Sequence, residues 1–364
     1  MVYTIYVSGT KFSGKTALCL GLFNNFNELG LKVGYFKPIG QGYKMVNGKF
    51  EDSDVHMMKE VIGLSESEEE ICPIVLGSRY LETITDSYEE SKNKVMNSYK
   101  NIKKNKDVLI VEAAQTPETL SGSELDLASL SKKFNAKVIF TIKGDNDTSA
   151  DKTLLYTDYL SKKGVDIMGI VINFVPIQQV ERMRGIVSEV LQNHELNVLG
   201  IIPDHRELTL PTVKDIVNVL EAEVLAGKNH LDEIVDNFLV GAMFPDAAMS
   251  WLRRSVDRAF ITGGDRADLV LMALETKPSV IILTGNIYPS TQVILAAERK
   301  GVPLILVRED TYAIIVKLEP SDYKISIPMS PKKIQLTRKI MREYIDWKPI
   351  LENFADYKNN KNIS

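Results

Sequence analysis

The sequence predicts an α/β protein with a doubly wound parallel sheet and, after it, a second and smaller α/β domain. Three observations lead to this prediction. A strand pattern at residues 2–7 runs into a glycine-rich turn and then into an apolar helix pattern. Apolar strands then alternate with helices as far as about residue 222, which is the rhythm of a parallel sheet. A shorter series of strands and helices follows over residues 233–320.

The composition is that of a globular protein without a membrane or nucleic-acid signature. The 364 residues suffice for two domains, and 44% are hydrophobic and 25% charged. The net charge of −4 gives nucleic-acid binding no electrostatic support. The first strand begins at Val2, which leaves no room for a signal peptide, and no apolar run reaches the ~18 residues of a membrane span. Cys19 and Cys72 read as buried thiols in a reducing cytosol. We therefore expect a cytoplasmic protein with no membrane and no nucleic-acid partner.

The first turn has the form of a phosphate-binding loop, or P-loop. Its residues are Gly9, Thr10, Lys11, Phe12, Ser13, Gly14, Lys15 and Thr16. In this pattern the glycines let backbone N–H groups curl round a phosphate, and the helix N-terminus adds a positive field. Lys15 would reach the outer phosphates and Thr16 would offer its hydroxyl to Mg²⁺. The alternative is a chance Gly/Lys turn, which the strand before it and the helix after it disfavour.

A second strand is expected at residues 32–37, ended by Pro38. Strand, helix and strand within ~40 residues make a βαβ unit, and ligands of such sheets bind at the carboxyl ends of the strands. Lys37 lies at such an end, where a lysine is able to stabilise charge on a transferring phosphoryl group. The alternative is a solvated lysine. Residues 40–50 read as a loop, and residues 64–70 as a solvated acidic turn.

Two carboxylates are candidates for holding Mg²⁺. Asp54 stands in the acidic run 51–54 that opens a helix, where capping is the alternative role. Glu112 ends the apolar strand 107–112, the pattern of a buried central strand that delivers an acid to the sheet edge. Mg²⁺ takes one or two carboxylates plus phosphate oxygens, so Thr16, Asp54 and Glu112 form a possible set. The alternative for Glu112 is a strand-end acid without a ligand.

Further strands are expected at residues 137–142, 167–173 and 198–203, with helices near 124–134, 149–163 and 176–193. Asn173 closes one of these strands, and its amide is able both to donate to and to accept from an adenine edge. By itself this residue is a weak indication of a nucleotide.

Together these residues resemble the dethiobiotin synthetase-like P-loop proteins, a group that includes amidating synthases of cobyric acid metabolism. The resemblance covers residues 1–222 and implies an ATP-binding domain. It assigns phosphate binding to residues 9–16, catalytic roles to Lys15 and Lys37, adenine binding to Asn173, and Mg²⁺ to Thr16, Asp54 and Glu112. The chain departs from dethiobiotin synthetase at residues 113–116 and 39–41, which argues against that enzyme's substrate.

Residues 35–41 and 199–213 are more similar to the N-terminal, non-catalytic region of long bacterial phosphate acetyltransferases. That similarity continues through a polar linker, 223–232, into residues 233–320, which resemble the DRTGG domain by their motifs at 262–266, 282–285 and 310–312. Within the first motif Asp265 reads as a helix N-cap and Arg266 as a first-turn residue. The alternative is a ligand-sensing edge at which Arg266 binds an anion. We expect residues 321–364 to form a helical tail.

We therefore expect a regulatory or ligand-sensing protein that binds Mg²⁺ and ATP. The resemblance does not extend to the acetyltransferase's catalytic domain, so we expect no acetyl transfer. The alternatives are an ATP-dependent ligase that phosphorylates a carboxylate or carbamate, and a structural module. The expected partners are ATP, an unknown small-molecule effector and, from the edge strands of both domains, a second copy of the chain.

Overall fold

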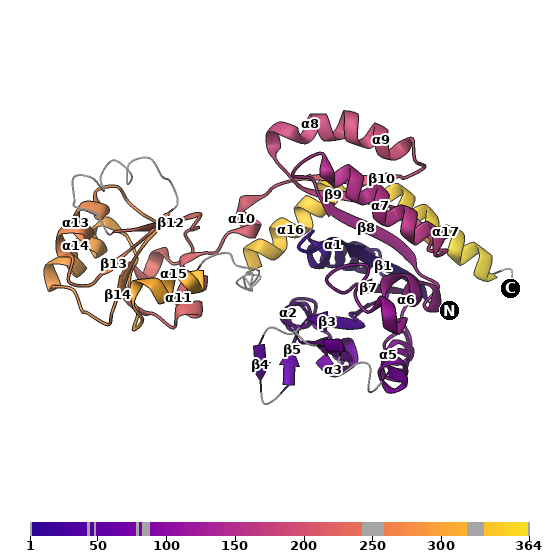
Figure 1. Cartoon of the computed structure of the whole chain (residues 1–364), viewed down its shortest axis with the longest axis horizontal. Coiled ribbons are helices and arrows are strands. Elements are labelled where there is room, and N and C mark those ends of the chain that lie inside the picture. The colour runs from indigo at the N-terminus through magenta and orange to yellow at the C-terminus, as the bar shows by residue number, and fades with distance from the viewer. Residues whose placement is uncertain are drawn as a thin grey trace. The chain divides into compact units, whose positions relative to one another are not determined.

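The computed structural model describes residues 2–41, 44–46, 49–77, 80–81, 88–241, 258–318 and 331–362. The chain divides into two compact units. The first consists of Met1–His205 together with Met329–Ser364, and the second consists of Arg206–Pro328. The second unit is therefore an insertion between two segments of the first, which Figure 1 shows by the colour running from indigo through orange to yellow.

The first unit is built on a six-stranded parallel sheet of order β10-β9-β8-β1-β7-β2. Its strands are β1 (Tyr3–Gly9), β2 (Val33–Phe36), β7 (Val108–Glu112), β8 (Lys137–Lys143), β9 (Ile167–Val175) and β10 (Val198–Pro203). Every residue of β1 and β7 is buried, as is typical of strands covered on both faces. Strands β2 and β7 lie on one side of β1, and the later strands β8, β9 and β10 lie on the other. The strand order therefore reverses at β1, and parallel sheets bind ligands beside such a reversal, which is where the loop after β1 lies.

The helices of this unit follow the expected alternation, with differences in detail. They are α1 (Lys15–Glu28), α2 (Ser53–Ile62), α3 (Glu68–Ile71), α5 (Tyr88–Ile102), α6 (Leu127–Lys133), α7 (Thr148–Lys162), α8 (Val180–Arg182) and α9 (Ser188–Gln192). A π-helical turn, Met183–Val187, joins α8 to α9 inside the helix expected at 176–193. No helix in the described part of the chain is both long and apolar enough to cross a membrane.

Two predicted loops contain regular structure. Residues 40–50 hold the end of β3 (Ile39–Gln41), which pairs with β6 (Ile74–Leu76), and an antiparallel pair, β4 (Lys44–Val46) and β5 (Lys49–Glu51). The acidic segment 64–70 was predicted to be a turn, but it begins α3. Ser67 and Glu70 form a reciprocal capping box there, so the acids stabilise a helix start.

The second unit has a five-stranded sheet of order β11-β15-β14-β13-β12. Its strands are β11 (Glu223–Ala226), β12 (Asn237–Val240), β13 (Arg258–Gly263), β14 (Val280–Thr284) and β15 (Leu304–Leu306), and only β11 is antiparallel to its neighbour. The longer helices are α11 (Val213–Leu220), α13 (Ala267–Leu274), α14 (Thr291–Lys300) and α15 (Thr311–Leu318). Apolar clusters cover both faces of the sheet.

The division between the units differs from the predicted boundaries. The prediction placed the first domain at 1–222 and a linker at 223–232. The structure places the division between His205 and Arg206, because α11 packs its apolar face, including Ile216, on the second sheet beside Ile261. The supposed linker contains β11, an edge strand of that sheet. The amphipathic pattern of α11 predicts a helix but does not say which sheet the helix covers.

The tail returns to the first unit as α16 (Pro331–Tyr344) and α17 (Trp347–Asn362). Helix α16 lies against α1, where Met341 fills the space over Gly21, and Figure 1 shows the yellow α16 beside the indigo α1. The ring of Phe354 on α17 lies 5.6 Å from Phe26 and 5.4 Å from Tyr3, measured between ring centroids. The tail is thus part of the first unit's core.

Candidate functional site

The glycine-rich loop joins β1 to α1 and is held against β8. The backbone N–H of Thr10 donates to the carbonyl of Thr141 at 3.2 Å, and the Ser13 hydroxyl donates to the carbonyl of Thr10 at 2.8 Å. A Cβ atom on Gly9 would lie only 1.9 Å from the Thr141 carbonyl oxygen. Gly14 has φ +89° and caps α1 without a side-chain hydrogen bond. The first N–H groups of α1 therefore have no side-chain cap, the arrangement found where helix N-termini receive anions.

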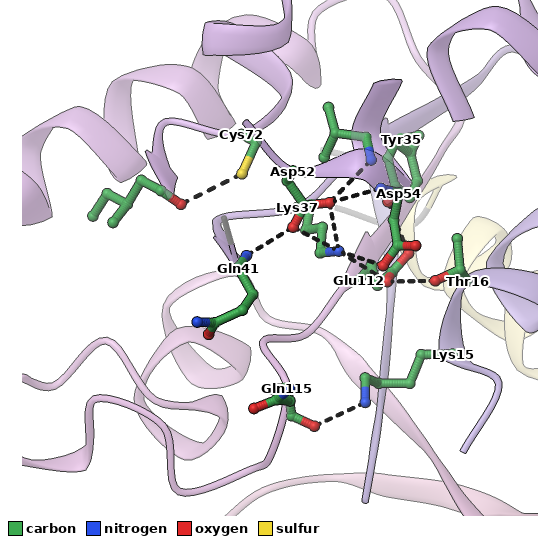
Figure 2. A network of polar contacts seen from close by, with 12 residues as sticks. Lys15, Thr16, Tyr35, Lys37, Gln41, Asp52, Asp54, Cys72, Glu112 and Gln115 are labelled. Atoms are coloured by element: carbon green, nitrogen blue, oxygen red, sulfur yellow. Dashed lines mark hydrogen bonds and ion pairs between the residues drawn. The ribbon is translucent and has the colours of Figure 1, made fainter. Parts of the chain in front are cut away.

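Lys15 is folded back over the loop. Its ammonium donates to the carbonyl of Thr10 at 3.0 Å. It also donates to the carbonyl of Gln115 at 2.9 Å, as Figure 2 shows. The side chain is buried, and burial lowers the pKa of Lys15 to about 8. The other loop residues, Lys11 and Phe12, lie at the loop's turn, with the Lys11 ammonium 4.9 Å from the centroid of the Phe12 ring.

Glu112 lies at the end of β7 and is only 1% exposed. The hydroxyl of Thr16 donates to Glu112 Oε1 at 2.9 Å, and the hydroxyl of Tyr35 donates to Oε2 at 2.8 Å. The ammonium of Lys37 is 3.4 Å from Oε1. Burial raises the pKa of the Glu112 carboxyl, and the charge of Lys37 opposes that rise. One carboxylate therefore connects β7, β2 and the start of α1.

Lys37 follows β2 and is the centre of an acidic cluster. Its ammonium is 3.0 Å from Asp52 Oδ2, 3.0 Å from Asp54 Oδ2 and 3.4 Å from Glu112 Oε1. Burial alone lowers the pKa of Lys37, but the three carboxylates, Asp52 foremost, outweigh burial and raise it well above its ordinary value. The charge of Lys37 in turn lowers the pKa of the Asp54 carboxyl. The alternative of a solvated Lys37 is wrong, since the side chain is 6% exposed.

Asp52 is a member of this cluster that sequence reasoning missed. It is the N-cap of α2, and its carboxylate accepts from the backbone N–H of Gln41 at 2.8 Å, of Asp54 at 3.0 Å and of Val55 at 3.1 Å. A Cβ atom on Gly40 would lie 2.7 Å from Asp52 Oδ2. The capping role was foreseen for the whole acidic run. One sequence feature could have indicated that Asp52 also pairs with Lys37. Asp52 and Asp54 stand close together at one helix start, which follows a lysine at a strand end.

Asn173 ends β9 and lies beside the loop. Its amide nitrogen donates to the carbonyl of Ser13 at 3.0 Å, and its amide oxygen accepts from the N–H of Phe174 at 2.9 Å. A Cβ atom on Gly14 would lie 2.2 Å from that amide nitrogen. The structure thus makes Asn173 a support of the loop. Adenine binding by this residue stays a prediction.

The oxygen donors around Glu112 fit a magnesium ion that is bound jointly by the protein and by phosphate oxygens. They fit a metal ion held by protein groups alone less well. Among the described residues, no group of three or more His, Cys, Asp or Glu side chains is arranged to hold a metal ion. Thr16 and Glu112 touch directly, while Asp54 joins them through Lys37. These are hard oxygen donors, and Mg²⁺ commonly takes one or two carboxylates and completes its shell with phosphate oxygens and water. The residues therefore fit Mg²⁺ that arrives with a phosphate.

The second unit carries its own strand-end motif. Arg266, and not the predicted Asp265, occupies the N-cap position of α13, because the helix begins one residue later than expected. The guanidinium of Arg266 pairs with Asp268, both contacts being 3.1 Å. The hydroxyls of Thr284 and Thr311 are 2.9 Å apart.

The six-stranded parallel sheet, the glycine-rich loop after its central strand and the helix behind it define a P-loop protein. The chain belongs to a family described as an AAA domain, whose sequence model matches residues 3–212, and a DRTGG domain model matches residues 215–321. The predicted family membership, a dethiobiotin synthetase-like P-loop domain followed by a DRTGG domain, is confirmed.

Two curated relatives illustrate these similarities. The chain is 24% identical to the phosphate acetyltransferase of Nitratidesulfovibrio vulgaris over 386 residues, which cover 99% of this chain and 53% of that protein. It is 25% identical to the ATP-dependent dethiobiotin synthetase BioD of Methanococcus vannielii over 215 residues, 58% of this chain and 98% of that one. The chain thus spans about half the length of the phosphate acetyltransferases that it matches.

Among solved structures, the chain is similar to the CBS and DRTGG domains of a Clostridium perfringens pyrophosphatase, which were crystallised with diadenosine tetraphosphate. The identity is 18%, the TM-score is 0.28, and the match covers 42% of this chain and 70% of that one.

Proposed function

We propose that this protein binds Mg-ATP at residues 9–16 and works as a regulatory, ligand-sensing protein, built like the N-terminal part of phosphate acetyltransferases. The observation that carries the proposal is the meeting of Lys15, Thr16 and Glu112 at one sheet edge. The Thr16 hydroxyl touches Glu112, and the Lys15 ammonium lies over the loop's own carbonyls.

Each residue would act through the group it already presents. The N–H groups at the start of α1 would receive phosphate oxygens, and Lys15 would exchange its carbonyl partners for the outer phosphates. Thr16, Asp54 and Glu112 would hold Mg²⁺, which neutralises charge on the phosphates when it is bound. Asn173 would keep the loop in shape from beside Gly14.

Calorimetric titration with Mg-ATP tests this proposal. We expect saturable heat with the wild-type protein and none with Lys15→Ala. Lys162→Ala is the matched control, because Lys162 pairs with Asp158 on an exposed surface of α7. Absence of binding by the wild type at millimolar nucleotide would contradict the proposal. If Lys15→Ala loses stability but keeps its ligand, a structural role of the loop is favoured instead.

The regulatory part of the proposal concerns the DRTGG unit. Arg266 and the Thr284–Thr311 pair lie at the carboxyl ends of β13 and β14, where parallel sheets bind ligands. We propose that an effector binds there and changes the affinity for ATP. A panel of phosphorylated and carboxylated metabolites, added during the ATP titration, tests for such coupling, and Arg266→Ala should abolish it.

We also propose that the protein binds a second copy of itself. Sedimentation measures the mass of the particle in solution and so tests for a dimer.

A second candidate function is an ATP-dependent ligase that phosphorylates a carboxylate or carbamate. The observation in its favour is Lys37, which touches Asp54 and Glu112 and so lies close to the phosphate loop. Phosphate release from ATP on addition of a carboxylate substrate, lost in Lys37→Ala, would support it. A metabolite screen without turnover and an unchanged Lys37→Ala variant would exclude it.

A further inference from the structure

Three carboxylates of the first unit share a single ammonium group. Lys37 lies within 3.0 Å of both Asp52 and Asp54 and 3.4 Å from Glu112, and Figure 2 shows the three acids converging on it. Two of these acids, Asp54 and Glu112, are the proposed magnesium ligands. The ammonium of Lys37 is thus already bonded to the oxygen atoms that the metal would need.

A metal ion and this ammonium cannot both stay on the same oxygen atoms. Like charges a few ångströms apart repel by about 4 kcal/mol even at the effective dielectric constant of a protein surface. Lys37 is only 5% exposed, so its ammonium cannot exchange these carboxylates for water where it lies. Lys37 must therefore keep a carboxylate that the metal does not take.

Asp52 is that carboxylate. It is 4% exposed, and three backbone N–H groups fix its position: those of Gln41, Asp54 and Val55. Asp54, in contrast, has a side chain that is 49% exposed, so a ligand can reach its carboxylate from solvent. Asp52 is thus held rigidly behind Lys37, while Asp54 lies on the open side.

We propose that Lys37 is a resident counter-cation of the magnesium site, and that Asp52 is the positioning residue that retains it when Mg²⁺ takes Asp54 and Glu112. This inference rests on the proposed function. It explains how three clustered acids are compatible with a folded protein before any metal binds, since an unpaired buried carboxylate is costly.

The first test uses Mg²⁺ alone, without nucleotide. The thermal midpoint of the full-length wild type should not respond to millimolar MgCl₂ beyond a NaCl control of equal ionic strength. Lys37→Met should gain a rise of about 2–4 °C, because its acids have lost their cation. If Lys37→Met does not fold, Lys37→Met/Asp52→Asn keeps Asp54 and Glu112 with less uncompensated charge and should gain the same rise. Lys162→Met is the control for loss of a lysine on the surface.

The second test measures the affinity for ATP with and without Mg²⁺. We define the ratio as the affinity for ATP with Mg²⁺ divided by the affinity without it. In Asp52→Asn this ratio should fall by at least about fivefold, because Lys37 then stays bound to the metal ligands. Asparagine still caps the helix with one oxygen but loses the bond from the Gln41 N–H, so a merely structural role of Asp52 predicts lower stability with an unchanged ratio. The double variant Lys37→Met/Asp52→Asn should recover the magnesium dependence.

The outcomes separate this inference from the proposed function. If the wild type binds Mg-ATP but Lys37→Met and the double variant both stay indifferent to Mg²⁺, the counter-cation role is wrong and nucleotide binding stands. An unchanged ratio in Asp52→Asn overturns the role of Asp52. If Lys37→Met gains a response to Mg²⁺ while the wild type binds no ATP, the counter-cation role stands and the proposed function is wrong.

Discussion

At the scale of single residues, the site is held together by hydrogen bonds and ion pairs between buried polar groups. Glu112 receives hydrogen bonds from Thr16 and Tyr35 as well as the charge of Lys37. A hydrogen bond to a buried charge contributes more to stability than one between neutral groups. The consequences of removing each donor can therefore be predicted separately.

Tyr35→Phe removes the hydroxyl that donates to Glu112 Oε2 at 2.8 Å. We expect the free energy of unfolding to fall by about 1.5–3 kcal/mol, because the carboxylate is buried and charged. Urea unfolding measures it. Tyr3→Phe is the matched control: the Tyr3 hydroxyl is also buried but has no hydrogen-bond partner among the residues that the structure describes, so its loss should cost almost nothing. Equal effects of the two substitutions would contradict the importance given to the contact with Glu112.

Gly14→Ala places a methyl group 2.2 Å from the Asn173 amide nitrogen at a residue with φ +89°. We expect lower stability, by about 1–3 kcal/mol for the backbone strain plus a further cost for the clash, and loss of nucleotide binding. Gly30→Ala is the control, since Gly30 has φ +77° but nothing within 4 Å of its Cβ position. The difference between the variants in thermal unfolding isolates the contact with Asn173. If the two variants lose the same stability, that contact is unimportant.

The sequence predicted this site in part. Lys15, Thr16, Glu112 and Lys37 stand next to strand ends, and the structure brings all four together. Asp52 could not be assigned, because an acid before a helix has a sufficient explanation as a cap. Its bond to Lys37 depends on where the start of α2 lies relative to the end of β2, and a one-dimensional pattern does not contain that information.

At the scale of elements, buried strands were the easiest to predict and polar segments the hardest. Strands β1 and β7 are continuous apolar runs because the sheet is covered on both faces. The short pair β4 and β5 has no such run, since three of its six residues are charged. Its pairing comes from backbone hydrogen bonds, which every residue type except proline can make.

The contact of α1 with α16 gives a prediction at this scale. Gly21→Ala would bring a Cβ atom to 2.5 Å from Cγ of Met341, so we expect a loss of about 1–3 kcal/mol although alanine favours helices. Combined with Met341→Ala, the loss should be smaller than the sum of the two single losses. Gly185→Ala has open space around its Cβ position and should be neutral or stabilising. Urea unfolding of these variants measures the losses in the free energy of unfolding. Additive losses in Gly21→Ala and Met341→Ala would contradict a direct contact between the two residues.

At the scale of the whole molecule, the tail belongs to the first unit and not to the unit that precedes it in sequence. A chain that ends at Pro328 should lose the stability of the first unit, because Ile340, Met341 and Ile350 are buried there at about 1.5–3 kcal/mol each. Calorimetry should show an earlier transition for that unit only. A variant that lacks only residues 358–364 is the control. Unchanged unfolding of the shorter chain would contradict the packing of α16 and α17.

The predicted domain boundary, after residue 222, differs from the division between His205 and Arg206 in the structure. Helix α11 has the apolar periodicity expected of either domain, and its place in the apolar cluster with Ile261 and Ile282 assigns it to the second unit. The helical character of the tail was predicted, but its packing partner was not, since amphipathicity predicts a buried face and does not identify the surface that covers it.

The return of the tail also bears on how the molecule is made. Arg342 on α16 pairs with Glu28 on α1, 314 residues away. A ribosome that adds 5–20 residues per second needs roughly 15–60 s to synthesise that interval. During this time Phe26 and Tyr3 lack their aromatic cover from α17, and β1 and α1 present an open apolar surface. The first strand to emerge is thus among the last to be shielded. The nascent chain is exposed to chaperones or to aggregation while the rest of the first unit and the whole second unit are translated.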